Sequence, residues 1–446
     1  MRINLPNSKT FSKIFNESTG IKISESIKGI ATDSREIQSG DLYIAIKGEK
    51  VDGHSFLNQV FENGALAALV SDINDQVHGN QIQVRDTIKS IGKIATEWRR
   101  QFNIPIIGIT GSNGKTSTKE LLRHILCSKF DIHATEGNYN TSIGLPLTLL
   151  QLNAFHGASI LEMGANRAGD IEILAKIANP NFGLITNIAP AHLEGFGSIE
   201  AVAKTKAAIF ENLGNGIAFV NAADRRVKEI TLKGDSISFG LNPDCDYPAD
   251  LHYEEDGTIT LTINTEEIPT LSSNLSFAKN IIACCAIARE LDVEWEAIKD
   301  RVSTFSPPKG RCEVKNNGSY IIIDDTYNAN LESTLAAIDY LSAFSGQGEK
   351  VFIFGDMLEL GDVSREQHIA IGEKCDEMEL SAVLTYGKET IVTSKSIKKV
   401  KINQHFDSKE ELIDFLQKII TSNDKILIKG SRGMRMETII QGVMEN

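Results

Sequence analysis

The residues with the clearest chemical potential lie in one stretch, 104–119, with the sequence IPIIGITGSNGKTSTK. An apolar run is followed by a glycine turn, a lysine and a threonine. If a strand ends and a helix begins here, the N–H groups of the turn converge at a helix N-terminus and can bind phosphate oxygens. The lysine adds a point charge, and the threonine hydroxyl can bind magnesium. The residues predicted to bind a nucleoside triphosphate are Asn113, Gly114, Lys115, Thr116 and Ser117.

The strict phosphate-loop pattern, G-x-x-x-x-G-K-[ST], has a glycine at the position of Ile109, so the stretch does not match it. The alternative interpretation is a glycine turn in an α/β protein without a ligand. A strand before the loop and a helix after it favour the nucleotide site, because phosphate loops occur in that context.

Two further residues follow neighbouring strands. Glu162 ends the apolar run Ala158–Glu162, and a buried carboxylate there is costly unless it has a cation. A magnesium ion shared with Thr116 and the phosphates would supply that cation. A solvent-exposed glutamate is the alternative. His192 follows the next strand, and only its position beside the same sheet edge distinguishes it from an ordinary loop histidine.

Lys206 lies on the apolar stripe of the expected helix 199–212, whereas Lys204 faces elsewhere. A lysine on a buried stripe needs an anionic partner, a lowered pKa or a modified amine. Its side chain could also extend to the rim of the protein, which is an equally good interpretation of the pattern alone.

Polar residues also follow the expected strand Tyr320–Asp324. Asp325 could bind hydroxyl groups, and the amides of Asn328 and Asn330 suit a peptide or a ribose. Asn330 could equally act only as a helix N-cap. Four further residues are candidates for binding an anion: Arg311, Lys429, Ser431 and Arg432. For each of them taken singly, ordinary surface charge is the commoner explanation.

The elements that must position these residues alternate between strand and helix, which predicts largely parallel sheets. Ligands of such sheets bind beyond the carboxyl ends of the strands, where these residues lie. The expected central strands are Ile104–Ile109, Ala158–Glu162, Phe182–Ile188 and Gly216–Asn221.

A second alternating series begins after the linker Ser306–Gly310, without a G-x-G-x-x-G after its first strand that would suggest a dinucleotide. The first hundred residues mix strand-like runs with short helices. We therefore predict an α/β protein of three domains. These are a small α/β domain over 1–103, a central parallel-sheet, ATPase-like domain with the phosphate loop over 104–305, and a Rossmann-like domain over 306–446.

The composition is that of a globular protein, with 446 residues, 41% hydrophobic and 24% charged. The net charge of -13 argues against a nucleic acid or an anionic membrane as partner. No apolar run approaches a signal peptide or a membrane span, so we expect a cytoplasmic protein. The six cysteines form no C-x-x-C pair, which disfavours disulfides and zinc, and we interpret them as buried thiols.

Taken together, the motifs resemble those of the muramoyl (peptidoglycan) ligases over nearly the whole chain. The phosphate loop also resembles that of the related folylpolyglutamate synthetases. In order, the matching segments are TDSR, KGEKVDGH, TGSNGKTS, GNYNTSIGLP, LEMGANRAGDI, TNIAPAHLEGFGS, DDTYNAN, GDMLELG and KGSR. DDTYNAN and GDMLELG resemble the dipeptide-adding branch, and the D-N-P-R of the diaminopimelate-adding branch is absent. SFAKN at Ser276–Asn280 departs from the family's H-N-x-x-N, and only Asn280 fits.

The resemblance implies roles for particular residues. The UDP end of a substrate would contact the first domain, and ATP would bind the central loop, with Arg311 and Asp325 near its nucleoside and Asn280 near its base. By resemblance, Lys206 is the position carbamylated in related ligases, which would make it a magnesium ligand alongside His192, with two magnesium ions in all. The implied substrate contacts are Ser34, Arg35, Lys47 and His54 for UDP, Asn140 and Thr141 for the muramoyl peptide, and Asn328 and Asn330 for a dipeptide.

The resemblance implies an ATP-dependent amide-bond ligase, working through an acyl phosphate, that adds D-alanyl-D-alanine to UDP-N-acetylmuramoyl-tripeptide for the cell wall. We expect a monomer that closes its third domain over the site before reaction, since water would hydrolyse the intermediate. The alternatives are a folylpolyglutamate synthetase-like ligase, a muramoyl ligase that adds a single amino acid, and a non-catalytic nucleotide-binding protein. The third residue of the tripeptide, diaminopimelate or lysine, stays open.

Overall fold

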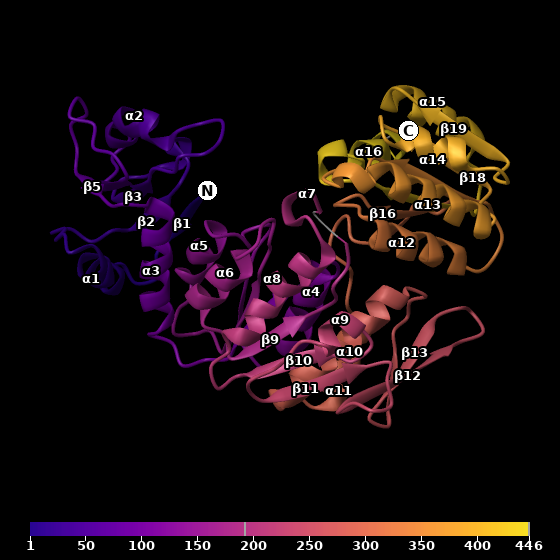
Figure 1. Cartoon of the computed structure of the whole chain (residues 1–446), viewed down its shortest axis with the longest axis horizontal. Coiled ribbons are helices and arrows are strands. Elements are labelled where there is room, and N and C mark those ends of the chain that lie inside the picture. Colours follow the sequence, from indigo (N-terminus) through magenta and orange to yellow (C-terminus); the bar gives the residue numbers. More distant parts are fainter. Residues whose placement is uncertain (191–192, 445–446) are drawn as a thin grey trace.

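The computed structural model describes residues 1–190 and 193–444. Within these residues the chain forms three sheets, each built from a separate part of the sequence (Figure 1). The first part lies at one side, the central part lies at the base, and the last part lies at the other side (Figure 1). This arrangement confirms the predicted α/β fold with three domains.

The first sheet has five strands in the order β1-β2-β3-β4-β5. The strand β1 is antiparallel to β2, and the other neighbours are parallel. Its strands are β1 Arg2–Asn4, β2 Gly29–Ala31, β3 Asp41–Ile44, β4 Ala67–Val70 and β5 Gln81–Gln83, and its helices are α1 Ser8–Thr19, α2 Leu57–Glu62 and α3 Thr87–Arg99, with 3-10 turns at Ser34–Glu36 and Gly53–Phe56.

The helix α3 joins the first part to the central part. Its buried residues Ile91, Ile94, Ala95 and Trp98 recur with helical spacing on one face. The Trp98 ring N–H donates to the carbonyl of Leu152 at 3.2 Å, and the Arg99 guanidinium donates to that of Ala178 at 3.1 Å. Because one helix packs against both parts, their cores form one continuous cluster.

The central sheet has the order β14-β13-β12-β11-β10-β9-β6-β8-β7, and every pair of neighbouring strands from β7 to β12 is parallel. At the other end of the sheet, β13 pairs in the antiparallel direction with both β12 and β14. Its strands are β6 Ile106–Thr110, β7 Ile132–Ala134, β8 Ala158–Glu162, β9 Phe182–Ile185, β10 Ile217–Asn221, β11 Ser236–Gly240, β12 Tyr247–Tyr253, β13 Ile259–Ile263 and β14 Glu266–Pro269. Its helices are α4 Lys115–Leu126, α5 Gly144–Leu149, α6 Asp170–Ala178, α7 Leu193–Phe196, α8 Ile199–Glu211, α9 Arg225–Lys228, α10 Leu275–Glu290 and α11 Trp295–Ser303.

Helices cover both faces of this sheet, which explains why its strands read as apolar runs. Along β6, Ile106 packs toward α5, α6 and α8, whereas Ile107 and Ile109 pack toward α4 and α10. The alternation of side chains along a strand therefore fixes α4 on one face and α8 on the other. Lys115 and Lys206 reach the loop after β6 from these opposite faces.

The third sheet has the order β15-β16-β20-β17-β18-β19, in which only β15 pairs in the antiparallel direction. Its strands are β15 Glu313–Asn316, β16 Ile321–Asp325, β17 Lys350–Gly355, β18 Ala382–Tyr386, β19 Ile402–Phe406 and β20 Lys425–Lys429. Its helices are α12 Leu331–Ala343, α13 Ser364–Glu377, α14 Thr390–Ser396, α15 Lys409–Ile419 and α16 Glu437–Met444, with 3-10 turns at Gly361–Val363 and Arg432–Met434.

One sequence-based interpretation needs correction. The cysteines are free, as expected, but they are not all buried: Cys127 is exposed, and Cys245 and Cys312 are half-buried. Among the helices of the described residues, none is long and apolar enough to cross a membrane.

Candidate active site

The loop between β6 and α4 turns at two glycines with positive φ angles, +151° at Gly111 and +79° at Gly114. A Cβ atom on Gly111 would lie 1.8 Å from the hydroxyl oxygen of Thr186, which no side chain can tolerate. On Gly114 it would lie 3.0 Å from Oδ1 of Asn280. The loop can therefore lie against β9 and α10 only because these residues are glycines.

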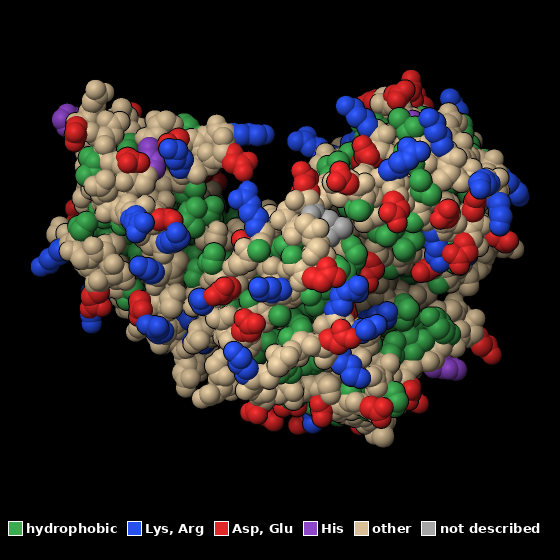
Figure 2. Space-filling view, in the orientation of Figure 1, with side chains coloured by type: hydrophobic (Ala, Val, Ile, Leu, Met, Phe, Trp, Pro, Cys, Tyr) green, Lys and Arg blue, Asp and Glu red, His purple; other side chains and the backbone are tan. Residues whose placement is uncertain are grey.

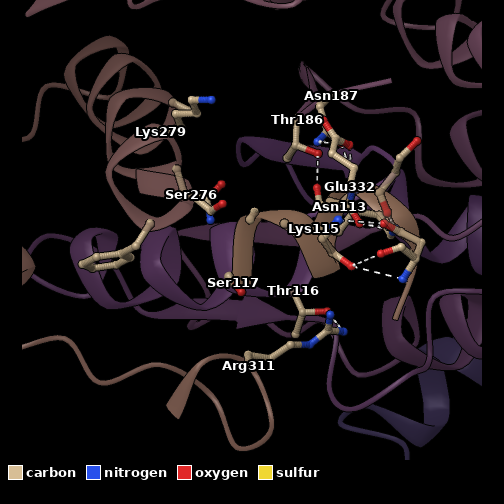
Figure 3. A pocket seen from close by; sticks show the side chains of 18 of the residues that line it. Asn113, Lys115, Thr116, Ser117, Thr186, Asn187, Ser276, Lys279, Arg311 and Glu332 are labelled. Carbon is tan, nitrogen blue, oxygen red and sulfur yellow. Dashed lines mark hydrogen bonds between the residues drawn. The ribbon is translucent and has the colours of Figure 1, made fainter. Parts of the chain in front are cut away.

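Asn113 is held from the central sheet. Its N–H donates to Oδ1 of Asn187 at 2.8 Å, and its carbonyl accepts from the hydroxyl of Thr186 at 2.6 Å (Figure 3). Of the five N–H groups expected to face phosphate, that of Asn113 is thus already bonded within the protein. The N–H groups at the start of α4, which have no partner inside the helix, remain for an anion.

Two lysine side chains meet at the carbonyl of Gly111. Nζ of Lys115 donates to this oxygen at 2.8 Å, and Nζ of Lys206 donates to it at 2.9 Å. Lys206 is only 4% exposed, so its side chain does not extend to the rim. Burial, and secondarily the charge of Lys115, lower the pKa of Lys206 well below its ordinary value. Burial also lowers the pKa of Lys115, although Glu162 opposes this.

Glu162 ends β8 beside the loop and is 3% exposed. Its Oε1 accepts from the amide of Asn140 at 2.8 Å, but its buried Oε2 has no hydrogen-bond partner. The burial expected of Glu162 is confirmed, and a buried carboxylate oxygen without a partner is costly unless a cation binds it.

The other predicted magnesium ligands differ in how far the structure describes them. The hydroxyl of Thr116 accepts from Nη2 of Arg311 at 3.1 Å (Figure 3). His192 lies outside the described residues. Within 1–190 and 193–444, no three His, Cys, Asp or Glu side chains form a metal-binding group.

The third domain reaches the loop through several side chains. The guanidinium of Arg311 lies 3.9 Å from the ring centre of Tyr327 while it bonds Thr116. The amide of Asn330 caps α12 and also donates to Oδ1 of Asn113 at 2.7 Å, so it does more than cap a helix.

Other residues predicted in this domain are bonded within it. Asp325 accepts from the N–H of Cys312 and from the ammonium of Lys429, so both carboxylate oxygens have partners. Lys429 also donates to the carbonyl of Asn328, whose own Oδ1 accepts from the N–H of Ala329.

A cavity of about 1220 Å³ lies between the central and third domains. Its walls include the phosphate loop, Glu162, the start of α10 and the start of α12. Asn280 lines it, as do Phe277 and Phe305, whose rings stack at 5.7 Å. Where the segment SFAKN departs from the family pattern, the cavity is therefore lined by the ring pair Phe277 and Phe305 and by the amide of Asn280.

The same cavity extends to Asn140 and Thr141, which were expected to contact a peptide. In the first domain, Ser34 is buried, the exposed Arg35 forms an ion pair with Asp33 at 2.6 Å, and Lys47 is exposed. His54 bonds Asp52 through Nδ1 at 2.6 Å and accepts from the N–H of Ser71 through Nε2 at 2.9 Å. His54 thereby connects the turn at Asp52 to the residue that follows β4.

Sequence reasoning did not single out Thr186, Asn187 or Glu332, all of which bond the loop residue Asn113. The segment TNIAP was recognised as a motif, and its first two residues are the ones that bond the loop. Glu332 carried no signal, because a glutamate in the first turn of a helix is common for other reasons.

Fold and site define a three-domain α/β protein in which the third domain completes a cavity beside the glycine loop that follows β6. Three family models match the chain: Mur ligase family, catalytic domain over 26–99, Mur ligase middle domain over 109–288, and Mur ligase, glutamate ligase domain over 310–432. The chain belongs to the Mur ligase family.

Among curated relatives, a Haemophilus influenzae protein is 35% identical over 94% of both chains, and one from Bacillus subtilis is 33% identical over 94% of both. Both are named UDP-N-acetylmuramoyl-tripeptide--D-alanyl-D-alanine ligase. A crystal structure of MurF from Acinetobacter baumannii matches with a TM-score of 0.90 at 31% identity, over 98% of both chains. That of MurF ligase from Thermotoga maritima in complex with ADP matches with 0.84 at 30%, over 93% of this chain and 97% of that one.

Proposed function

We propose that this chain is an ATP-dependent ligase that adds D-alanyl-D-alanine to UDP-N-acetylmuramoyl-tripeptide in peptidoglycan precursor synthesis. The similarity to ligases of that name along 94% of the chain carries the proposal. The site supports it, because one cavity joins a phosphate loop to residues of a third domain and to Asn140 and Thr141. The complex of a similar protein with ADP supports ATP as a substrate.

The residues near the loop fit magnesium. Glu162 offers an unpartnered buried oxygen, and Thr116 offers a hydroxyl. Bound there, Mg²⁺ would offset the negative charge that develops on the phosphates. We propose two such ions, with His192 and Lys206 completing the ligands.

We further propose that Lys206 is carbamylated. A neutral amine is required to capture carbon dioxide, and burial beside Lys115 favours the neutral form of Lys206. The product would be an anion next to the Lys115 ammonium, which would replace the repulsion between two cations by an attraction.

The reaction would then proceed in two steps. The terminal carboxylate of the tripeptide attacks the γ-phosphorus of ATP, giving an acyl phosphate and ADP, while Lys115 donates to the transferring phosphate. The amine of D-alanyl-D-alanine loses a proton and attacks the acyl carbon, and phosphate leaves. Arg311, Asp325 and Asn280 would hold the nucleoside, and Asn328 and Asn330 the dipeptide.

The remaining roles are also proposals. Ser34, Arg35, Lys47 and His54 would hold the UDP end of the substrate, with domain boundaries near residues 103 and 305. We propose a monomer acting in the cytoplasm, where precursor synthesis for cell-wall growth and division would take place.

Release of phosphate from ATP by the purified protein tests the proposal. UDP-muramoyl-tripeptide and D-alanyl-D-alanine are both supplied and then each is omitted in turn. Release should require both and should yield a UDP-pentapeptide. Release with a folate and glutamate instead would favour the folylpolyglutamate synthetase-like alternative. Release with a single amino acid would favour another muramoyl ligase, and no release with any of these would contradict a ligase function.

A further inference from the structure

The side chain of Asn113 in the phosphate loop is bonded from the third domain at both of its ends. Its Oδ1 accepts from the amide of Asn330 at 2.7 Å. Its Nδ2 donates to Oε2 of Glu332 at 2.8 Å (Figure 3). The amide of Asn187 lies 3.4 Å from the same carboxylate oxygen. The backbone of Asn113 is held by the two residues that follow β9, and its side chain is held from the start of α12, so this residue connects the two domains.

Glu332 lies in the first turn of α12, on the wall of the cavity. Desolvation of its carboxyl group by the surrounding side chains raises the pKa of Glu332, and the negative charge of Asp224 acts in the same direction. The hydrogen bond from Asn113 opposes this rise, as do the charges of Lys279 and Arg226. No salt-bridge partner of Glu332 is found among the described residues, so its partners are the amides of the loop region.

We propose that Glu332 is a positioning residue that docks the third domain onto the phosphate loop through Asn113. In this role the carboxylate accepts the Asn113 amide and does not take part in proton transfer. Docking at the loop itself means that the third domain, which would bring the dipeptide, is aligned on the loop that would hold the phosphates. The inference rests on the proposed function for its kinetic test but not for its structural test.

The structural test is hydrogen exchange of the ligand-free protein, followed for the amides of residues 111–117. Glu332→Ala should exchange these amides faster than the wild type, and Glu332→Gln, which keeps an acceptor oxygen, should restore slow exchange. Glu366→Ala, which removes an exposed glutamate from α13 of the same domain, is the matched control and should behave as the wild type. Equal exchange in Glu332→Ala and the control would overturn the docking role.

The kinetic test compares the same variants in the ligase assay. Loss of one charge-assisted hydrogen bond should lower kcat about tenfold in Glu332→Ala, whereas Glu332→Gln should keep kcat within about threefold of the wild type. The acid limb of the pH profile should be the same in Glu332→Gln and the wild type. If Glu332→Gln is as impaired as Glu332→Ala, or its acid limb moves, the carboxylate takes part in proton transfer and the positioning role is wrong.

A double-mutant cycle assigns the effect to the contact with Asn113. Asn113→Ala and Glu332→Ala remove the same hydrogen bond, so the double variant should lose little more kcat than the worse single variant. Fully additive losses would contradict the contact as the cause. A wild type without turnover would refute the proposed function, and hydrogen exchange would still decide the docking role.

Discussion

At the scale of single residues, the meeting of Lys115 and Lys206 at the carbonyl of Gly111 sets the chemistry of the site. Two ammonium groups that share one acceptor repel each other, and the more buried one is the easier to deprotonate. Lys206 is that residue, since it is 4% exposed whereas Lys115 is half-buried, and burial lowers the pKa of Lys206 well below its ordinary value. The apolar stripe in the sequence left burial and extension to the rim as equal interpretations, and it did not indicate the second lysine beside Lys206.

Lys206→Ala should lower kcat roughly tenfold or more if the side chain holds magnesium as a carbamate. Lys204→Ala, two residues away on the exposed face, should leave kcat unchanged. In wild-type protein, isotope-labelled bicarbonate should give a carbamate signal by NMR that is missing from Lys206→Ala. Full turnover of Lys206→Ala would remove the proposed role of this residue.

At the scale of elements, the loop between β6 and α4 depends on close contact with β9. Gly111→Ala places a Cβ atom 1.8 Å from the Thr186 hydroxyl, which must then move and give up its bond to Asn113. We expect ATP binding, measured by calorimetry, to weaken roughly tenfold or more.

Gly20→Ala is the control for the effect of a positive φ angle without a steric clash. Gly20 also has a positive φ angle, +72°, but a Cβ atom there would meet nothing within 4 Å. It should keep wild-type affinity for ATP with a small loss of stability. Equal ATP affinity in Gly111→Ala and the wild type would show that the loop can move away from β9 without cost.

A buried histidine links three elements of the central domain. On β7, the ring of His133 bonds the hydroxyl of Ser159 on β8 at 2.8 Å and the carbonyl of Thr148 on α5 at 2.9 Å. Burial lowers the pKa of His133 from 6.5 to about 4. The folded protein therefore keeps the ring neutral at pH values where the unfolded chain takes up a proton.

This contribution to stability is complete above pH 6.5 and is lost as the pH falls toward 4, by up to about 3 kcal/mol. Urea unfolding, followed by the fluorescence of Trp98 in a Trp295→Phe background, should show the loss. His133→Gln should have a flatter pH dependence in this window, and the exposed-site control His252→Gln should not. Identical slopes in all three proteins would contradict the assignment to His133.

The sequence predicted the elements best where apolar periodicity is strong. The strand β8 has the predicted bounds, and the helix α8 ends one residue before the predicted end. The prediction missed β19, because INQHF has an alternating polar face and lies at the sheet edge. It also missed the helix α14, TIVTSKS, which is short and rich in polar and β-branched residues.

At the scale of the whole molecule, the sequence indicated three blocks but not their contacts. The hydrogen bond from Arg311 to Thr116 joins residues that are 195 positions apart. The bond from Asn330 to Asn113 joins residues that are 217 positions apart. Neither pair has a local pattern, because tertiary contacts of this kind depend on how the domains pack. The motifs could nominate each partner singly but could not pair them.

The third domain already contacts the phosphate loop, whereas a wide hollow separates it from the first domain (Figure 2). The proposed tripeptide substrate would have to span this hollow, from the UDP-binding candidates of the first domain to Glu162. Closure around it would exclude water from the acyl phosphate.

We therefore expect small-angle scattering to report a smaller radius of gyration when a non-hydrolysable ATP analogue and the UDP-tripeptide are both bound. The analogue alone should have a smaller effect, because its site lies between domains that already touch. Lys115→Ala, which removes the ammonium of the loop, should need more analogue to reach the compact state. A profile that both ligands leave unchanged would show that the molecule reacts without closing, and that the hollow in Figure 2 is as wide during catalysis as before it.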